Sequence, residues 1–403
     1  MKTKRIYLRN KNKSIKNNPW SRLVKNNCRF LNNSKVKKNA VKIKKIALEE
    51  AIIWPTQTED VVENVPLEYV INTGKGNNKY NRLLDITDLR LKEMDENNVV
   101  FQIISPTAAG IQGLKLKSKL DQVNKAKEIN DYMYKQIENF PNRFRAFATL
   151  PMRDPKEAAH ELDRCVKNLK MLGALVNGND ILHTGKNHEN AEILFYDTPD
   201  YDVLWSKFVE LDVPLYIHPT VYMSPNGSTP DPQYVDFYKK YPQLSASAWG
   251  FSIYLAEHMF RLVLSGVFDR FPKLKIILGH MGEILPWWAK RFDHRLCVYK
   301  QELNEISKED FNKAGLKEFH IPKLTMEEYL KQNFYITTSG WYSDDDLKYT
   351  IKKVGIDRVL FSIDYPYEKQ NIACEWMDNV PLSLKDKEKI AYKNAAKLLK
   401  IKM

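Results

Sequence analysis

Short apolar runs recur along the chain from about residue 43 onward, and stretches with helical spacing of apolar residues separate them. This alternation of strand-like and helix-like segments is typical of a parallel α/β fold. We place eight strands, at Ile46–Leu48, Val99–Ile104, Phe144–Thr149, Ala174–Asn177, Leu215–His218, Lys275–Leu278, Phe334–Thr338 and Val359–Ile363. Eight strands that alternate with helices predict an α/β fold of the (β/α)8 TIM-barrel type.

One helix start is clear in this pattern. Asp154 is suited to capping a helix N-terminus, and Pro155 is suited to the first helical position. Apolar residues then recur at helical spacing, at Ala158, Leu162, Cys165 and Leu169. Two other stretches, 219–250 and 301–323, are longer than ordinary connections. The first follows a strand end, so we expect a long βα-loop at the mouth of the barrel, facing the substrate.

Charge divides the chain into two parts. The 403 residues carry a net charge of +13, yet residues 1–45 hold 16 Lys or Arg and no Asp or Glu. The rest of the chain therefore carries a net charge of −3, which gives no indication of a nucleic-acid surface. We predict a basic, Asn/Lys-rich leader at 1–42, either disordered or a targeting segment, followed by one barrel domain at 43–403.

Four residues able to bind a metal or move protons stand at the ends of predicted strands that lie far apart in sequence. They are Glu49, His218, His280 and Asp364. In (β/α)8 enzymes the active site lies at the C-terminal mouth, where the strand ends meet. A single His or Asp at a strand end is often only a turn or capping residue. Coincidence at four of eight predicted strand ends indicates a metal-dependent enzyme instead.

The four residues differ in the role that their chemistry suggests. Glu49, His218 and Asp364 would supply two oxygens and one nitrogen, an oxygen-rich set that suits Mg or Mn better than Zn. His280 lies in a Gly-His-Met-Gly-Glu segment, so Glu283 follows within reach of its imidazole. These two are candidate catalytic groups.

Three further residues are candidates for substrate binding. Arg90 and Arg291 are suited to a planar carboxylate, because a guanidinium donates two parallel hydrogen bonds. Tyr367 stands just beyond Asp364 and could line a pocket for a flat ring. For both arginines a surface salt bridge is the competing interpretation.

These residues lie in stretches that resemble one family. The sequence is similar to the metal-dependent aromatic acid decarboxylases of the amidohydrolase superfamily, most of all to 2,3-dihydroxybenzoate decarboxylase, with the 5-carboxyvanillate and γ-resorcylate decarboxylases nearby. The resemblance runs collinearly from about residue 43 to 401. The matching stretches are 45–51, 146–150, 173–177, 212–219, 277–283, 336–340 and 361–366.

The resemblance implies a role for each candidate. Glu49, His218 and Asp364 match metal ligands, and Asp364 also matches the acid that protonates the ring. His280 and Glu283 match the pair that holds the phenolic group of the substrate. Arg291 matches a substrate-binding arginine, and Arg90 matches one that is less uniform across the family. Several relatives have a His where this chain has Ala51, which further favours Mn or Mg over Zn.

The function expected from this resemblance is non-oxidative decarboxylation of an ortho-hydroxybenzoate, such as 2,3-dihydroxybenzoate, to a phenol and CO2. The alternative is a metal-dependent hydrolase of the same superfamily that acts on a lactone, ester or amide. Such hydrolases often carry His-x-His after the first strand and a carboxylated lysine after the fourth. This chain has Glu49-Glu50-Ala51 and Asn177 there. A third possibility is a binding protein with a decayed site, which the retained polar residues argue against.

We accordingly expect one divalent metal ion, Mn or Mg before Zn, and no organic cofactor. The expected ligand is a small aromatic carboxylic acid, with no nucleic acid and no membrane as partner. We also expect a homo-oligomer, either a dimer or a tetramer. Four cysteines without CxxC spacing fit a reducing, cytoplasmic setting. An organelle such as the mitochondrion is the alternative if the leader is a transit peptide.

Overall fold

The computed structural model describes residues 41–55, 78–114, 116–184, 190–220, 240–313 and 320–403. A sheet of β1, β2 and β3 and a second sheet in the order β10-β9-β8-β7-β4 contain only parallel pairs. Parallel bridges from Ala148 to Ala174 and from Glu50 to Tyr365 join the two sheets at both edges. The eight strands therefore close into the predicted barrel. Their bounds are β1 (Lys45–Ile52), β2 (Val99–Pro106), β3 (Phe144–Ala146), β4 (Ala174–Asn177), β7 (Leu215–His218), β8 (Ile276–Leu278), β9 (Phe334–Thr337) and β10 (Val359–Leu360).

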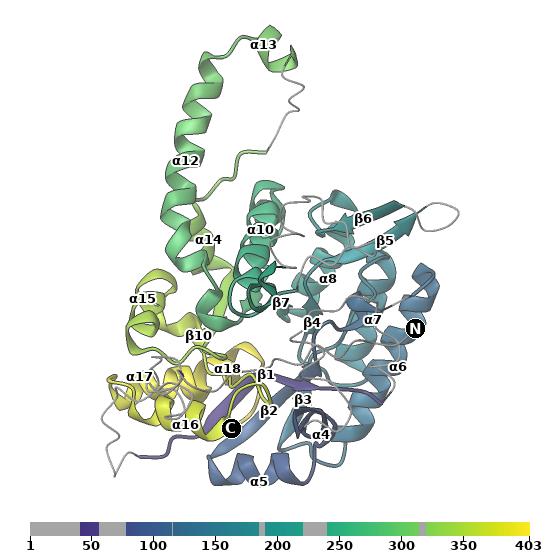
Figure 1. Cartoon of the computed structure of the whole chain (residues 1–403), viewed down its shortest axis with the longest axis vertical. Helices are drawn as coiled ribbons and strands as arrows, with labels where there is room; N and C mark the ends of the chain where they lie inside the picture. The colour runs from purple at the N-terminus through teal and green to yellow at the C-terminus, as the bar shows by residue number, and fades with distance from the viewer. Residues whose placement is uncertain (1–40, 56–77, 115, 185–189, 221–239, 314–319) are drawn as a thin grey trace, which may run out of the picture.

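Helices follow the strands and surround the barrel (Figure 1). The longer ones are α5 (Leu89–Glu96), α6 (Lys119–Ile137), α7 (Pro155–Lys167), α8 (Asp202–Leu211), α10 (Gly250–Leu264), α12 (Leu285–Glu305), α15 (Asp344–Val354) and α16 (Gln370–Asn379). The shorter ones are α4 (Asn78–Leu84), α11 (Val267–Arg270), α13 (Lys308–Lys313), α14 (Met326–Gln332), α17 (Leu384–Glu388) and α18 (Asn394–Leu398). Among the described residues, no helix is both long and apolar enough to cross a lipid bilayer.

The helix predicted after Asp154 is confirmed as α7. The Asp154 carboxylate accepts hydrogen bonds from the N–H groups of Lys156 and Glu157, at 3.1 and 3.2 Å, and Pro155 occupies the first turn. Ala158, Leu162 and Cys165 are buried. The cap satisfies two of the N–H groups that have no partner inside the helix, which is why the helix begins there.

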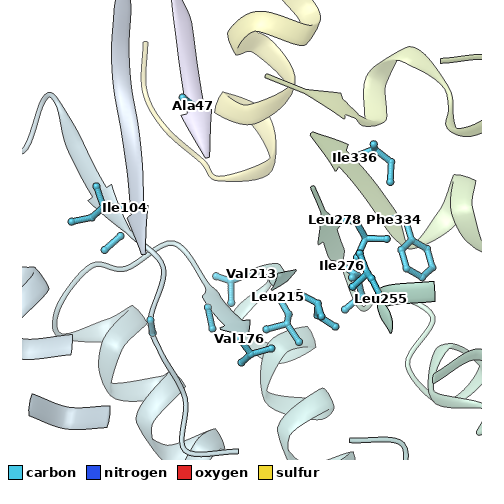
Figure 2. Close-up of a cluster of buried hydrophobic side chains, with 14 of the residues drawn as sticks. Ala47, Ile104, Val176, Val213, Leu215, Leu255, Ile276, Leu278, Phe334 and Ile336 are labelled. Atoms are coloured by element: carbon cyan, nitrogen blue, oxygen red, sulfur yellow. The ribbon is translucent and has the colours of Figure 1, made fainter. Parts of the chain in front are cut away.

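Two apolar clusters alternate along the strands. Ile276 and Leu278 belong to an outer cluster that includes residues of α6, α7 and α10, whereas Ile277 between them belongs to an inner cluster. Figure 2 shows part of the outer cluster, with Leu255 of α10 beside side chains from several strands. The inner cluster consists mostly of strand residues, with Ala395 and Leu398 of α18 and the following Leu399 added. Because side chains of a strand alternate between its two faces, the inner cluster fills the barrel.

Several details of the strands differ from the prediction: β2 ends later than predicted, at Pro106, and β3 and β10 end earlier, at Ala146 and Leu360. β1 continues to Ile52, so Glu49 lies inside this strand and not after it. Ala47 pairs with Gln102 and Glu50 pairs with Ile104, so β1 has one extra residue between these pairs. Such a bulge changes which face the following side chain points to. A hairpin of β5 (Asp180–Thr184) and β6 (Asn190–Leu194) was not predicted, because its sequence is polar at many positions.

Segments distant in sequence meet at the β1 edge of the barrel. Figure 1 shows the yellow C-terminal part of the chain beside the purple strand β1. The Ala51 N–H donates to the Tyr365 carbonyl at 2.7 Å, next to the bridge between Glu50 and Tyr365. We call the contact between β1 and the segment 361–366 the closing seam. α12 points away from the barrel and ends near α13 (Figure 1).

Parts of the sequence that carried predictions lie outside the described residues. Residues 1–40 contain almost all of the predicted leader, and residues 221–239 contain most of the first long loop. Residues 314–319 belong to the second long loop. The disorder or targeting role of the leader and the substrate-facing role of the first loop therefore stay predictions.

The contacts at the start of the described chain predict where the domain begins. Removal of residues 1–40 should leave a folded protein that still binds metal, because the Ile43 N–H and the Lys45 Nζ both bond to the Asp378 carboxylate, at 3.0 and 2.8 Å. Removal of residues 1–45 should destabilise the protein by about 3–5 kcal/mol, since it leaves the Asp378 carboxylate without its buried cation. Urea unfolding of the two truncated proteins measures both effects. Equal stability of both would contradict this boundary.

Candidate active site

Glu49 is the centre of a polar cluster at the mouth of the barrel. Its side chain is 5% exposed, and its Oε2 accepts hydrogen bonds from the hydroxyls of Tyr216 on β7 and Ser339 after β9. The Tyr216 hydroxyl also lies 3.1 Å from the Thr337 hydroxyl. Tyr216 belongs to the inner cluster, and Glu49, which it contacts, therefore also points into the barrel. The extra residue in β1 accounts for this direction of the Glu49 side chain. The hydroxyl donors fix one carboxylate oxygen and leave Oε1 for another partner.

Two imidazoles point their Nε2 atoms toward that free oxygen. Glu49 Oε1 lies 3.5 Å from Nε2 of His218 and 3.3 Å from Nε2 of His280. The opposite ring nitrogens lie beside carbonyls: His218 Nδ1 is 2.6 Å from the Pro219 oxygen, and His280 Nδ1 is 2.9 Å from the Ser339 oxygen. A carbonyl only accepts, so each Nδ1 carries a hydrogen. In the neutral imidazole each Nε2 then presents a lone pair to the cluster.

The backbone around His280 is unusual. His280, Met281 and Glu283 all have positive φ angles, of 49°, 55° and 54°. Positive φ angles are disfavoured for residues that carry a side chain. Where they occur, they concentrate at functional sites. Gly279 precedes them where a Cβ would lie 2.7 Å from Glu49 Oε2. The absence of a side chain at Gly279 lets the β8 segment approach the carboxylate closely.

Asp364 and Glu283 complete the acidic surroundings of His280. Asp364 has a φ of 72° and lies in the segment after β10. Its Oδ2 and His280 Nδ1 both face the α-carbon of Gly340, because a Cβ built there would lie 3.4 and 3.2 Å from them. Glu283 is 3% exposed and accepts a hydrogen bond from the Ser252 hydroxyl at 2.5 Å. The structure thus brings all five predicted metal-binding and catalytic residues to one place.

Electrostatics in the cluster are dominated by the pair of Glu49 and His280. Burial by itself would raise the pKa of Glu49, but attraction to His280 and His218 and hydrogen bonds outweigh it and lower the pKa to about 2. Burial would lower the pKa of His280, yet the charges of Glu49, Glu283 and Asp364 raise this pKa well above its ordinary value. Glu49 is therefore ionised, and the cluster attracts positive charge.

The other groups respond mainly to burial. Burial, with the nearby charge of Glu49, raises the pKa of Asp364 well above its ordinary value, against the attraction of His280. Burial also raises the pKa of Glu283 and lowers that of His218. Asp364 and Glu283 thus hold protons more tightly than exposed carboxylates do, a property of groups that transfer protons.

The donor atoms fit a divalent cation. Glu49, His218 and His280 each offer a ligand atom, and these atoms all lie within 4.8 Å of one another. Among the described residues, Glu49 Oε1 and His280 Nε2 are buried without a hydrogen-bond partner. Burying such atoms costs free energy unless something binds them. Glu49 and His218 were predicted as ligands. The third member of this triad is His280, which was predicted as a catalytic group, and Asp364, the third predicted ligand, lies beside it.

Aromatic and amide groups form part of the wall. The ring of Phe251, at the start of α10, contacts the His218 ring edge-to-face, with centroids 5.8 Å apart. Asn177 pairs with His218 across β4 and β7. Within the described part of the chain, its Oδ1 is buried without a hydrogen-bond partner. The wall therefore offers an aromatic ring and an amide oxygen beside His218.

Arg90 does not reach the cluster. Its side chain is fully buried, and its guanidinium donates to the carbonyls of Asp85, Ala51 and Arg82, at 3.0, 2.8 and 3.2 Å. It also stacks on the Tyr365 ring, 4.4 Å from the centroid. These contacts use its donors within the protein. They favour a role in supporting the closing seam over the predicted contact with a substrate carboxylate.

The described contacts do not place the other two candidates in the cluster. Arg291 is exposed on α12, and none of the described hydrogen bonds or ion pairs joins it to the cluster. The Tyr367 hydroxyl hydrogen-bonds the Thr107 hydroxyl, and its ring lines a cavity of about 470 Å³ with residues of α4, α5 and the segment after β10. Glu49, His218 and His280 do not line that cavity.

Sequence reasoning missed the residues that orient the cluster. Tyr216 and Ser339 hold Glu49, Ser252 holds Glu283, and Phe251 covers His218. A signal for two of them was present. Tyr216 precedes His218 by two residues, so both side chains point to the same face of β7, and Ser339 closes an unusually hydroxyl-rich strand end.

A parallel eight-stranded barrel with a carboxylate and two imidazoles converging at its mouth defines a metal-dependent barrel enzyme. Comparison with known families agrees, since the model of the amidohydrolase family matches residues 80–401. The γ-resorcylate decarboxylase of Polaromonas sp. strain JS666 is 38% identical over 320 residues, which cover 79% of this chain and 89% of the relative. The chain belongs to the amidohydrolase family, among its aromatic acid decarboxylases, and is a carboxy-lyase.

Solved structures show the same likeness. A dihydroxybenzoic acid decarboxylase from Polaromonas sp. JS666, crystallised with manganese and the inhibitor 2-nitroresorcinol, has a TM-score of 0.72 and 36% identity. The match covers 89% of this chain and 97% of that one. The 5-carboxyvanillate decarboxylase of Sphingomonas paucimobilis has a TM-score of 0.72 and 29% identity, over 89% and 100% of the two chains. The predicted resemblance, the TIM barrel and the divalent metal are confirmed.

The orientation of the imidazoles predicts the effect of removing one. His218→Ala should weaken Mn²⁺ binding by more than about 10-fold, because it removes a nitrogen ligand, a larger loss than that of a supporting hydrogen bond. Calorimetric titration of the metal-free protein with Mn²⁺ measures this. His160→Ala is the control, since that side chain is 76% exposed on α7. Unchanged Mn²⁺ affinity of His218→Ala would place the metal elsewhere.

Proposed function

We propose that the chain decarboxylates a benzoate with a hydroxyl group ortho to the carboxylate, releasing CO2 and a phenol. The single observation that carries this proposal is the cluster of Glu49, His218 and His280 beside Asp364. Relatives named for γ-resorcylate, which is 2,6-dihydroxybenzoate, support the substrate class. The sequence-based expectation of 2,3-dihydroxybenzoate is kept as one member of this class.

Glu49 and His218 would bind the metal ion. Asp364 is the third ligand that the sequence indicates, and His280 is the third residue of the triad that the structure brings together. When bound, a divalent ion neutralises negative charge on neighbouring oxygens of the substrate and fixes their orientation. An ortho-hydroxybenzoate offers two such oxygens side by side. A para-hydroxybenzoate offers only its carboxylate.

The residues of the chain then have to move one proton. Asp364, whose pKa burial raises well above its ordinary value, delivers the proton to the ring carbon that bears the carboxylate. The bond from that carbon to the carboxylate then breaks, its electron pair returns to the ring, and CO2 leaves. His280 and Glu283 hold the phenolic oxygen and set its protonation. Asp364 regains its proton from solvent.

Substrate-binding roles are proposed for two residues outside the cluster. Arg291 would donate to a carboxylate, because its guanidinium is exposed and suited to a charge-assisted hydrogen bond. Tyr367 would contact the ring from the side of the segment after Asp364. We do not extend this to Arg90, whose donors are used within the protein. The expected homo-oligomer and the cytoplasmic location, or an organelle instead, stay predictions.

A panel of substrates tests the proposed class. With added Mn²⁺, the protein should convert at least one ortho-hydroxybenzoate among 2,3-dihydroxybenzoate, 2,6-dihydroxybenzoate, salicylate and 5-carboxyvanillate. It should leave 4-hydroxybenzoate unchanged, because that isomer lacks a neighbouring hydroxyl. Loss of acid and appearance of phenol are followed by chromatography.

The same panel separates the competing functions. Turnover of 4-hydroxybenzoate alone would contradict the requirement for two neighbouring oxygens. Rapid hydrolysis of a lactone or ester, with no CO2 from any benzoate, would favour the hydrolase alternative.

Two substitutions should separate chemistry from binding. Asp364→Asn should abolish turnover, because an amide cannot deliver the proton. Arg291→Met should mainly raise KM, by about 10- to 100-fold, since a charge-assisted hydrogen bond contributes about 1.5–3 kcal/mol. Steady-state kinetics at saturating Mn²⁺ distinguishes them. A near-native rate for Asp364→Asn, or an unchanged KM for Arg291→Met, would remove that residue from its role.

A further inference from the structure

Glu50 is a buried carboxylate that the proposed reaction does not use. It follows Glu49 directly, yet its side chain lies in the closing seam and is fully buried. Its Oε1 accepts a hydrogen bond from the Ile363 N–H at 3.0 Å, and its Oε2 accepts one from the Tyr365 N–H at 3.3 Å. These two N–H groups stand on either side of Asp364. The Glu50 carboxylate thus hydrogen-bonds the backbone on both sides of Asp364, the proposed proton donor.

Ser362 connects the Glu50 carboxylate to the backbone of Glu49, the neighbouring candidate metal ligand. Its hydroxyl donates to Glu50 Oε1 at 3.3 Å and accepts from the N–H groups of Leu48 and Glu49, at 3.1 and 2.6 Å. The backbone of Glu49 and the backbone of Asp364 are therefore held by one small buried network. Movement on one side of the seam would displace both acids of the site.

The chemistry of the contacts calls for a carboxylate and not an amide. Glu50 faces three donors, the N–H groups of Ile363 and Tyr365 and the Ser362 hydroxyl. A glutamine of the same shape would turn an NH2 group toward at least one of them, which loses a hydrogen bond and sets two donors against each other. Burial raises the pKa of Glu50 to about 7, and the hydrogen bonds to Ile363 and Tyr365 and the attraction of Arg90, which stacks on Tyr365, oppose this only in part.

The backbone segment that Glu50 hydrogen-bonds contains a disfavoured conformation. Asp364 has a φ of 72°, a conformation disfavoured for a residue with a side chain. Such a conformation persists only where the surroundings fix it. The hydrogen bonds to the residues before and after Asp364 are the kind of support that does so.

We propose that Glu50 is a positioning residue, which holds the strained segment at Asp364 and thereby aims the Asp364 carboxyl at the substrate and the metal site. This inference rests on the proposed function for its kinetic effect. Its effect on metal binding follows from the position of the cluster alone.

The test compares Glu50→Gln with Glu161→Gln. Glu161 is an equally buried carboxylate, 1% exposed, which bonds to Asn130 and Arg164 on the outer side of the barrel. Both variants lose charge-assisted hydrogen bonds, so both should lose stability. Only Glu50→Gln should lower kcat at saturating Mn²⁺, by about 10- to 100-fold with little change in KM, and raise the Mn²⁺ dissociation constant by about 10-fold. Kinetics, metal titration and thermal unfolding are measured on the same preparations.

The outcomes are separable. Native kcat and Mn²⁺ affinity in Glu50→Gln would overturn the inference, as would equal losses in Glu161→Gln, which would mark a general effect of destabilisation. If the wild-type chain releases no CO2 but Glu50→Gln alone weakens Mn²⁺ binding, the proposed function fails while the positioning role stands. Should Glu50→Gln not fold, Ser362→Ala breaks the same network with a smaller change and should shift kcat and Mn²⁺ affinity in the same direction.

Discussion

Burial of negative charge at the mouth of the barrel is the constraint on which this structure depends. Glu49, Glu283 and Asp364 lie together with two imidazoles in a place that excludes most water. Carboxylates in such a place are costly unless positive charge joins them or they bind protons. The raised pKa values of His280 and Asp364 express that demand. A divalent cation held by Glu49 and the imidazoles would meet the same demand.

The barrel meets this constraint through its backbone. One extra residue in β1 turns Glu49 inward, and left-handed conformations at His280 and Asp364 turn two loops toward it. None of these features is favourable on its own, since bulges interrupt a ladder and positive φ is disfavoured for residues with a side chain. The surrounding regular barrel, with its inner and outer apolar clusters, supplies the stability that holds them. The polar mouth is thus built from the least regular parts of a regular fold.

Much of this could be predicted from sequence, because it depends on periodicity. The eight strands and the capped helix at Asp154 follow from the apolar pattern, and the parallel barrel brings their ends together whatever the loops do. What failed depends on contacts that sequence spacing does not encode. The position of Glu49 inside β1 needs the register with β2. The burial of Arg90 needs the carbonyls of a distant strand, and the β5–β6 hairpin lacks the alternation that marks a strand.

The adjacent glutamates show why a motif alone does not assign roles. Glu49 and Glu50 are the same residue type, one peptide apart, yet the bulge sends one to the imidazoles and the other to the closing seam. Ala51, where several relatives have a histidine, packs in a small apolar cluster with Tyr80 and Leu83. This chain lacks the nitrogen that such a histidine would supply. His280 Nε2 is the second nitrogen of the candidate triad, beside that of His218. The candidate triad combines one carboxylate with two imidazoles, and Asp364 beside it adds a second carboxylate, the kind of donor that suits Mn or Mg.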